Sequence, residues 1–211
     1  MNRTVFLLSA LLIALPALAQ GGETKTTPLT GVPKVREQID DLSLLKSLIP
    51  LKLTTEQIEA LVVPMRAAST AATALQKQAD EAVAALAPDV NKAYTGALAG
   101  TPIPESLEKK VADGNKAAAD RYQAARRKAV SEILAVAKLQ FTPSQKEEIE
   151  KQCIAFYGGK RVPARYKEDP SKAPRQEVAD LAVQGYIEQI LLFDRTLTLL
   201  EKMRTAQAKG E

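Results

Sequence analysis

Residues 53–57 have the sequence LTTEQ, and residues 141–145, 88 positions later, have the sequence FTPSQ. Both have the form apolar-Thr-x-x-Gln. In this pattern the Thr hydroxyl accepts a hydrogen bond from the backbone N–H three residues later, and the Gln side chain reaches back to the Thr N–H. Each copy therefore predicts a helix start, the second strengthened by a proline at the first helical position. The candidate capping residues are Leu53, Thr54, Gln57, Phe141, Thr142 and Gln145.

Apolar residues recur at three- and four-residue steps on both sides of these starts, and no segment alternates as a strand does. We predict an all-α protein of five or six helices, forming an elongated bundle of long helices that pack as helical hairpins. Pro64 lies inside one predicted helix, so we expect a kink there. The predicted helices span residues 34–49, 54–86, 89–99, 104–140, 142–157 and 174–208.

The N-terminal residues have the features of an export signal. Arg3 is followed by an uncharged apolar run, and Ala17-Leu18-Ala19 has the small-x-small form of a cleavage site. We predict a signal peptide over residues 1–19, cleavage after Ala19, and a periplasmic protein. Residues 20–33 are rich in Gly, Thr and Pro, which predicts a disordered linker before the helical region.

The composition disfavours several classes of function. A formal net charge of +4 with nine aromatic residues (five Tyr, four Phe) does not favour nucleic-acid binding. The chain has no histidine, which excludes His-dependent triads and His-bearing metal sites. No Gly-rich phosphate loop is present. We therefore expect no enzyme activity, no catalytic residue, no metal and no cofactor. The single cysteine, Cys153, is either a buried inert thiol or a link between two chains.

Basic residues gather in the predicted helix 104–140 and in a predicted loop over residues 158–173. A C-terminal helical segment, residues 174–211, follows this loop, and we expect it to pack on the same domain. If the loop folds back on the helix, six of these residues form one patch that attracts acidic segments or anionic head groups. Solvated surface charge is the alternative for each of them. They are Arg121, Arg126, Arg127, Lys160, Arg161 and Arg165.

The doubled apolar-Thr-x-x-Gln phrase, on a helical chain with an export signal, resembles the Spy/CpxP family of periplasmic stress proteins. The mark of that family is Leu-Thr-x-x-Gln, usually in two copies. Residues 53–57 match it fully, and Phe141 replaces the leucine in the second copy. The resemblance covers residues 34–157. It implies long kinked helices, a homodimer, and binding of unfolded clients without ATP. Some relatives bind zinc through His or Cys, a property that we do not carry over to this chain.

We expect an ATP-independent chaperone of the envelope stress response that binds unfolded or partly folded envelope proteins. Two alternatives stay open at this point. One is a regulatory adaptor that binds the outer domain of a membrane sensor, and the other is a structural subunit of a helical scaffold. A chaperone suppresses the aggregation of several unrelated clients, an adaptor binds one partner, and a scaffold forms a fixed oligomer.

Overall fold

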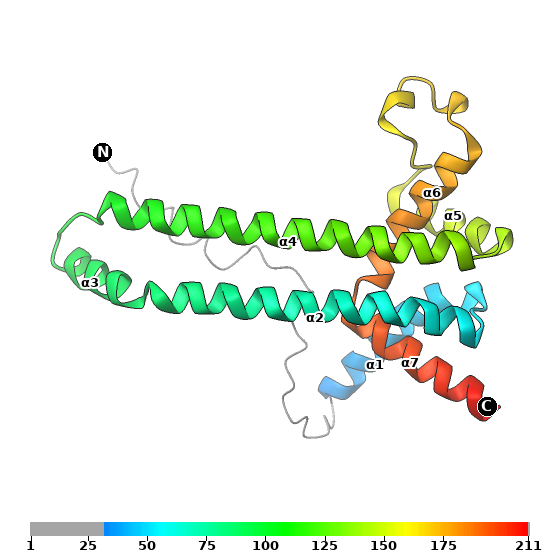
Figure 1. Cartoon of the computed structure of the whole chain (residues 1–211), viewed down its shortest axis with the longest axis horizontal. Helices are drawn as coiled ribbons and strands as arrows, with labels where there is room; N and C mark the ends of the chain where they lie inside the picture. The colour runs from blue at the N-terminus through cyan, green and yellow to red at the C-terminus, as the bar shows by residue number, and fades with distance from the viewer. Residues whose placement is uncertain (1–31, 211) are drawn as a thin grey trace. The chain divides into compact units, whose positions relative to one another are not determined.

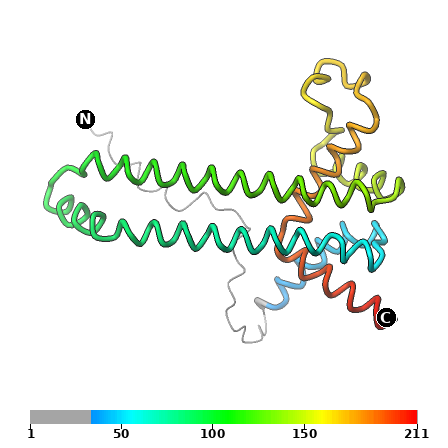
Figure 2. Tube along the Cα trace, viewed as in Figure 1, coloured from blue at the N-terminus to red at the C-terminus, as the bar shows by residue number. Residues whose placement is uncertain are grey.

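The computed structural model describes residues 32–210, and the predicted signal peptide and nearly all of the predicted linker lie outside this range. The described chain is all-helical and contains no strand, as the sequence predicts (Figure 1 and Figure 2). It holds seven α-helices: α1 (Val32–Leu48), α2 (Thr55–Ala85), α3 (Ala87–Leu98), α4 (Glu105–Gln140), α5 (Pro143–Tyr157), α6 (Arg175–Tyr186) and α7 (Asp194–Lys209).

The helix count differs from the predicted five or six because the C-terminal segment is two helices. A single π-helical turn, η5 (Ile187–Leu191), follows α6, and the extended backbone of Phe193 then starts α7. The Thr196 hydroxyl donates to the Ile190 carbonyl at 2.6 Å, a hydrogen bond across the break between η5 and α7. Neither Pro nor Gly occurs at this break, so the sequence carries none of the usual signals for a helix end.

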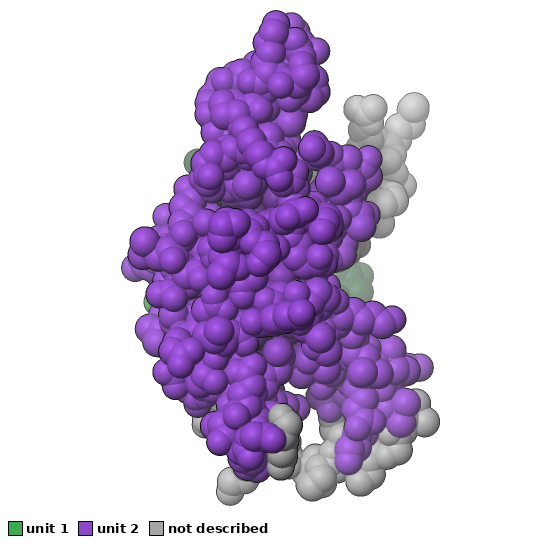
Figure 3. Space-filling model, turned by 90° about the vertical axis from the view of Figure 1, so that its right-hand side faces the viewer, with its two compact units in different colours: residues 1–21, 69–127 green, residues 22–68, 128–211 purple. Residues whose placement is uncertain are grey.

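The described chain divides into two compact units (Figure 3). The first unit includes residues 69–127, which contain α3 and the adjoining parts of α2 and α4. Few of its side chains are buried; Ala72 and Leu107 are among them, and α3 buries none. An ion pair between Asp89 and Lys110, 2.9 Å long, joins α3 to α4, and the lysine lowers the pKa of the Asp89 carboxyl. This unit is therefore held by little apolar burial.

The second unit, residues 22–68 and 128–211, contains the core of the protein. Here α5 packs on α6, and α1 contacts α7. The Tyr186 hydroxyl, buried in this core, donates to the Ser47 carbonyl at 2.9 Å and so joins α6 to the end of α1. The largest fully buried side chains of the described chain all lie in this unit: Tyr186, Leu48, Leu51, Ile58, Leu61, Ile133, Ile149, Ile187, Leu191, Leu200, Val183 and Thr196.

The end of α5 has a simple physical cause. Gly158 ends α5 with φ of 69°, a left-handed conformation that glycine adopts without steric cost. The following loop, residues 158–173, contains two short 3₁₀ turns, Ala164–Tyr166 and Pro170–Lys172.

Pro64 lies inside α2 without ending it. Over residues 32–210, no helix combines the length and the apolar character that a bilayer crossing requires.

Candidate functional site: the paired capping boxes and the exposed apolar faces

Both apolar-Thr-x-x-Gln phrases form closed capping boxes. At the start of α2, the Thr54 N–H donates to Gln57 Oε1 at 3.0 Å, and the Gln57 N–H donates to Thr54 Oγ1 at 3.3 Å. At the start of α5, the Thr142 N–H donates to Gln145 Oε1 at 2.8 Å, and the Gln145 N–H donates to Thr142 Oγ1 at 3.3 Å. The two helix starts thus have the same local geometry, and in each the box satisfies two N–H groups that a helix start leaves open.

The two capping glutamines also bind each other. Gln57 Nε2 donates to Gln145 Oε1 at 3.0 Å, and Gln145 Nε2 donates to Gln57 Oε1 at 2.9 Å. The second proton of Gln57 Nε2 goes to the Gln140 carbonyl at 2.7 Å, and that of Gln145 Nε2 goes to the Leu51 carbonyl at 2.8 Å. Each side-chain amide therefore makes all four of its hydrogen bonds, although only 6% of Gln57 and 7% of Gln145 is exposed.

Each glutamine side chain also donates a hydrogen bond to a backbone carbonyl next to the other phrase. Gln140 is the last residue of α4, and Leu51 is the last residue of the 3₁₀ turn η2 (Ile49–Leu51). Each glutamine thus caps the helical element that precedes the other copy. The first residues of the phrases, Leu53 and Phe141, are both buried. The two glutamines therefore connect two helix starts and two helix ends in the core. The network consists of amide, hydroxyl and backbone groups.

Helix α7 reaches the first capping box through a residue that the sequence analysis does not single out. Gln207 Nε2 donates to the Leu53 carbonyl at 2.9 Å, and the Thr55 hydroxyl donates to Gln207 Oε1 at 3.0 Å. Because Gln207 lies on the exposed last turns of a polar helix, no local pattern indicates this role. The C-terminal segment is therefore built onto the same unit as the capping boxes.

The six basic candidates are divided between the two compact units. Arg121, Arg126 and Arg127 lie on α4 in the first unit, whereas Lys160, Arg161 and Arg165 lie in the loop of the second unit. A single patch of all six residues stays a prediction.

The three loop cations each contact an acidic side chain of the second unit. Lys160 lies 3.7 Å from Glu150, Arg161 lies 3.9 Å from Glu188, and Arg165 donates to Glu177 at 2.6 Å. These pairs join the loop to α5 and α6, but such partly exposed ion pairs add little stability. Part of the positive charge of the loop is thereby compensated.

Arg161 also stacks on an aromatic ring. Its guanidinium carbon lies 4.6 Å from the centre of the Tyr157 ring. A Cβ atom at Gly185 would lie only 2.5 Å from Arg161 Nη1 and 3.2 Å from the Tyr157 ring. The absence of a side chain at Gly185 therefore leaves room for the loop to close on α6, a role that the sequence does not reveal.

Cys153 has the environment of an inert thiol, the first of the two readings left open by the sequence. It is buried, and its Sγ donates to the Ala182 carbonyl at 3.0 Å. Burial raises the pKa of the thiol to about 11, so the reactive thiolate is scarce at neutral pH. Within residues 32–210, no group of three or more Cys, Asp or Glu side chains is placed to hold a metal ion.

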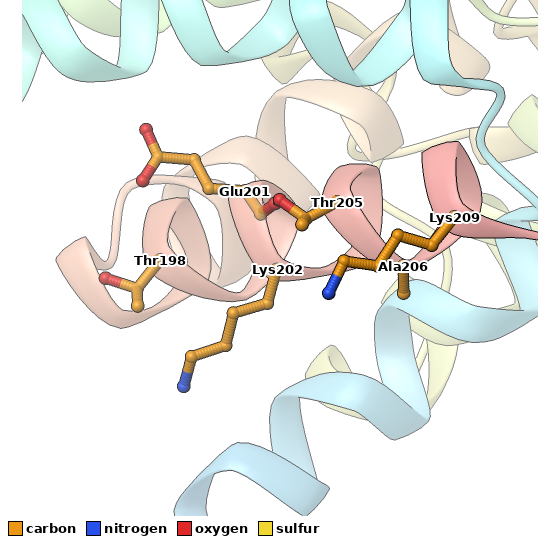
Figure 4. Close-up of a pocket in the computed structure, with 6 residues that line it drawn as sticks. All are labelled: Thr198, Glu201, Lys202, Thr205, Ala206 and Lys209. Atoms are coloured by element: carbon orange, nitrogen blue, oxygen red, sulfur yellow. The ribbon is translucent and has the colours of Figure 1, made fainter. Parts of the chain in front are cut away.

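An open hollow of about 350 Å³ lies along one side of α7. Figure 4 shows its side chains projecting from successive turns of that one helix. The Glu201 carboxylate in this lining is paired with Arg66 of α2. The hollow lacks the enclosed, convergent polar groups of a catalytic cleft. It is lined by Thr198, Glu201, Lys202, Thr205, Ala206 and Lys209.

Two helices expose apolar side chains at helical spacing. On α3, the side chains of Val90, Tyr94 and Leu98, which we call the α3 stripe, follow one another at four-residue steps, and 65% of Tyr94 and 74% of Leu98 is exposed. A turn of 3.6 residues places all three on one face. A second exposed row of apolar side chains lies on α1. These are the surfaces of the described chain best suited to apolar ligands.

Comparison of the chain with models of protein families, with curated proteins and with solved structures gives no match.

Proposed function

We propose that this protein is a periplasmic, ATP-independent chaperone that shields apolar segments of unfolded envelope proteins. The α3 stripe carries the proposal. Its helix buries no residue, yet it displays a valine, a tyrosine and a leucine on one face. Removing apolar surface from water is favourable by about 25 cal/mol for each Å². A client that covers this exposed face therefore gains binding free energy.

The difference between the two units in the number of buried side chains also supports a binding role. The second unit buries most of the apolar core residues, which include those around the paired capping boxes, whereas the first unit is Ala-rich and buries few side chains. The α3 stripe is surrounded by small side chains and has no pocket shaped for one particular ligand. Because selective binding requires such complementary features, the stripe can bind unfolded segments of many different sequences. The resemblance of LTTEQ and FTPSQ to the Spy/CpxP mark adds to this support. The predicted helical-hairpin packing of the long helices remains part of the proposal.

The cations on α4 give the proposed chaperone a means of faster encounter with its clients. Arg121, Arg126 and Arg127 lie on α4 in the same unit as the α3 stripe. Positive charge attracts acidic segments of a client over about a Debye length, roughly 10 Å at 0.1 M salt. We expect salt to slow the capture of acidic clients, while the apolar contact itself persists.

The test adds the purified protein to a chemically unfolded client without nucleotide and follows light scattering. We expect suppression of scattering for several unrelated clients. A variant with Tyr94→Ser and Leu98→Ser should lose most of this effect, whereas a control with Asn91→Ser and Thr95→Ser on the same helix should keep it. Unchanged scattering at every protein ratio would remove the chaperone proposal. Tight binding of one sensor domain with no suppression would favour the adaptor, and a fixed oligomer with neither property would favour the scaffold.

A further inference from the structure

The first unit, residues 69–127, is folded with very little apolar burial. Within this range only Ala72 and Leu107 are buried, and the ion pair between Lys110 and Asp89 joins two exposed side chains, which adds little stability. The second unit, by contrast, contains all of the largest fully buried side chains of the described chain. Because burial is what offsets the loss of backbone freedom on folding, the first unit should open at a lower free energy than the core of the second.

A glycine inside α4 weakens the first unit further. Gly114 lies in an ordinary α-helical conformation, where glycine is less favourable than alanine because it loses more backbone freedom. A Cβ atom at this position would have no neighbouring atom within 4 Å. Packing therefore does not require a glycine here, in contrast to Gly185 of the second unit, where a Cβ would lie 2.5 Å from Arg161.

Opening of the first unit would uncover apolar side chains that the closed state shields in part. Leu75, Leu86, Val111 and Tyr122 are half-buried within this unit, whereas the α3 stripe is already exposed. In the open state these four side chains would add to the stripe as surface that an unfolded segment can cover.

The remaining parts of α2 and α4 belong to the second unit and are fixed there. Leu61 of α2 and Ile133 of α4 are fully buried. At the start of α2 the Gln57 side chain closes the capping box and donates to the carbonyl of Gln140, the last residue of α4, at 2.7 Å. An opening of residues 69–127 therefore stops where these buried contacts begin, and the core keeps its fold.

We propose that residues 69–127 open as one cooperative unit below the global unfolding transition, and that this opening controls the capture of clients. The control rests on the proposed chaperone function, whereas the opening itself does not. The α3 stripe provides the first contact, and tight capture takes place in the open state, so the apparent affinity for a client is proportional to the open fraction. Because unfolding absorbs heat above room temperature, capture should increase on warming before the core unfolds.

The first test is hydrogen exchange of the mature protein, read by mass spectrometry of peptides. The slowest amides of residues 69–127 should exchange at least about tenfold faster than those of α5 and α6. Gly114→Ala should slow them about fivefold, the equivalent of about 1 kcal/mol, throughout the unit and also in α3. Ala119→Gly, at an exposed residue of the same unit, should speed them by the same factor.

Ala135→Gly is the matched control, because this exposed residue lies on the same helix but in the second unit. It should leave the exchange of residues 69–127 unchanged. Equal exchange in the two units, or an effect of Gly114→Ala confined to its own helical turn, would overturn the proposal.

The second test measures the concentration of protein that halves the light scattering of an unfolded client. Gly114→Ala should raise this concentration about fivefold, Ala119→Gly should lower it, and Ala135→Gly should leave it unchanged. All three variants keep the α3 stripe, so a difference reports the opening and not a lost contact. Equal suppression by the parent protein and Gly114→Ala, with slower exchange in the variant, would overturn the control while the chaperone function stands. If the parent protein suppresses no scattering at any temperature below core unfolding, the chaperone function and its control both fail.

Discussion

The side-chain amides of Gln57 and Gln145 exchange two hydrogen bonds, of 3.0 Å and 2.9 Å, across 88 residues of sequence. Each amide at the same time closes a capping box and caps a carbonyl that ends a neighbouring helical element. A buried amide with all of its partners is stabilising, but the loss of one partner leaves the other unsatisfied. The doubled phrase is therefore one connected polar element within the core.

This pairing predicts that the two glutamines are energetically coupled. Gln57→Ala and Gln145→Ala should each lower the free energy of unfolding by about 1–3 kcal/mol, because each leaves a buried amide with unmet hydrogen bonds. The double variant should cost less than the sum of the singles, as residues of one network are not additive. Urea denaturation measures the free energies. Gln76→Ala, at a partly exposed glutamine of α2 outside the network, should change stability by about 0.5 kcal/mol or less. Additive effects would contradict the coupling.

The threonines of the two boxes should contribute local stability only. Thr54→Ala and Thr142→Ala should each lower the free energy of unfolding by about 1 kcal/mol through the lost cap. Thr54→Ser and Thr142→Ser keep the hydroxyl and should stay close to the parent protein. Thermal and urea denaturation measure these differences. Suppression of client aggregation should persist in all four variants below the unfolding temperature, and its selective loss in the alanine variants would assign the threonines a direct binding role.

Cys153 should be unreactive in the folded protein. Its thiol has a pKa raised by burial from 9.0 to about 11, so the unfolded state ionises first as the pH rises. The contribution of this thiol to stability is complete below pH 9 and falls as the pH rises toward 11. A thiol reagent at pH 8 should modify the protein only after denaturant is added. Cys153→Ser should leave the sedimentation behaviour unchanged, and rapid labelling of the native protein would show that the thiol is accessible.

The Arg195 contacts should control how firmly α1 is held. Arg195→Met keeps the apolar stem of the side chain but removes its hydrogen bonds to Glu37 and Asp41. We expect faster amide hydrogen exchange over residues 34–46, with little change in α5 and α6, because these residues of α1 have no other buried anchor. Arg204→Met, at another arginine of α7, is the control, since the ion pair of Arg204 with Glu59 of α2 is longer, 3.7 Å. Equal exchange in the parent and the Arg195 variant would contradict this role.

Much of the secondary structure follows from local sequence signals. The two threonines, Pro143 and Gly158 predict where α2 and α5 start and where α5 ends, because capping involves residues only a few positions apart. The break between α6 and α7 was not predictable in this way. Five of the seven residues from Ile187 to Phe193 are apolar and continue the helical periodicity. In the structure the π-turn joins α6, which packs on α5, to α7, which contacts α1.

The candidate binding surfaces were less predictable than the helices. Periodicity predicts that Val35, Ile39 and Leu42 share a face, but the Arg195 contacts turn that face outward. The basic residues were evident as charges, whereas the partners Glu150, Glu177 and Glu188 of the loop cations follow only from the fold. The roles of Gln207 and Gly185 have no local signal, since each depends on a segment distant in sequence.

The sequence by itself determined that this protein is all-helical, where its capping boxes form, and that His-dependent chemistry is excluded, because residue type and short-range spacing control these properties. Only the tertiary structure decided that Gln57 pairs with Gln145, that the last helical segment divides in two, and that α1 exposes its apolar side. Those outcomes depend on contacts between residues far apart in sequence, whose burial and hydrogen bonding outweigh the smaller local preferences of each segment.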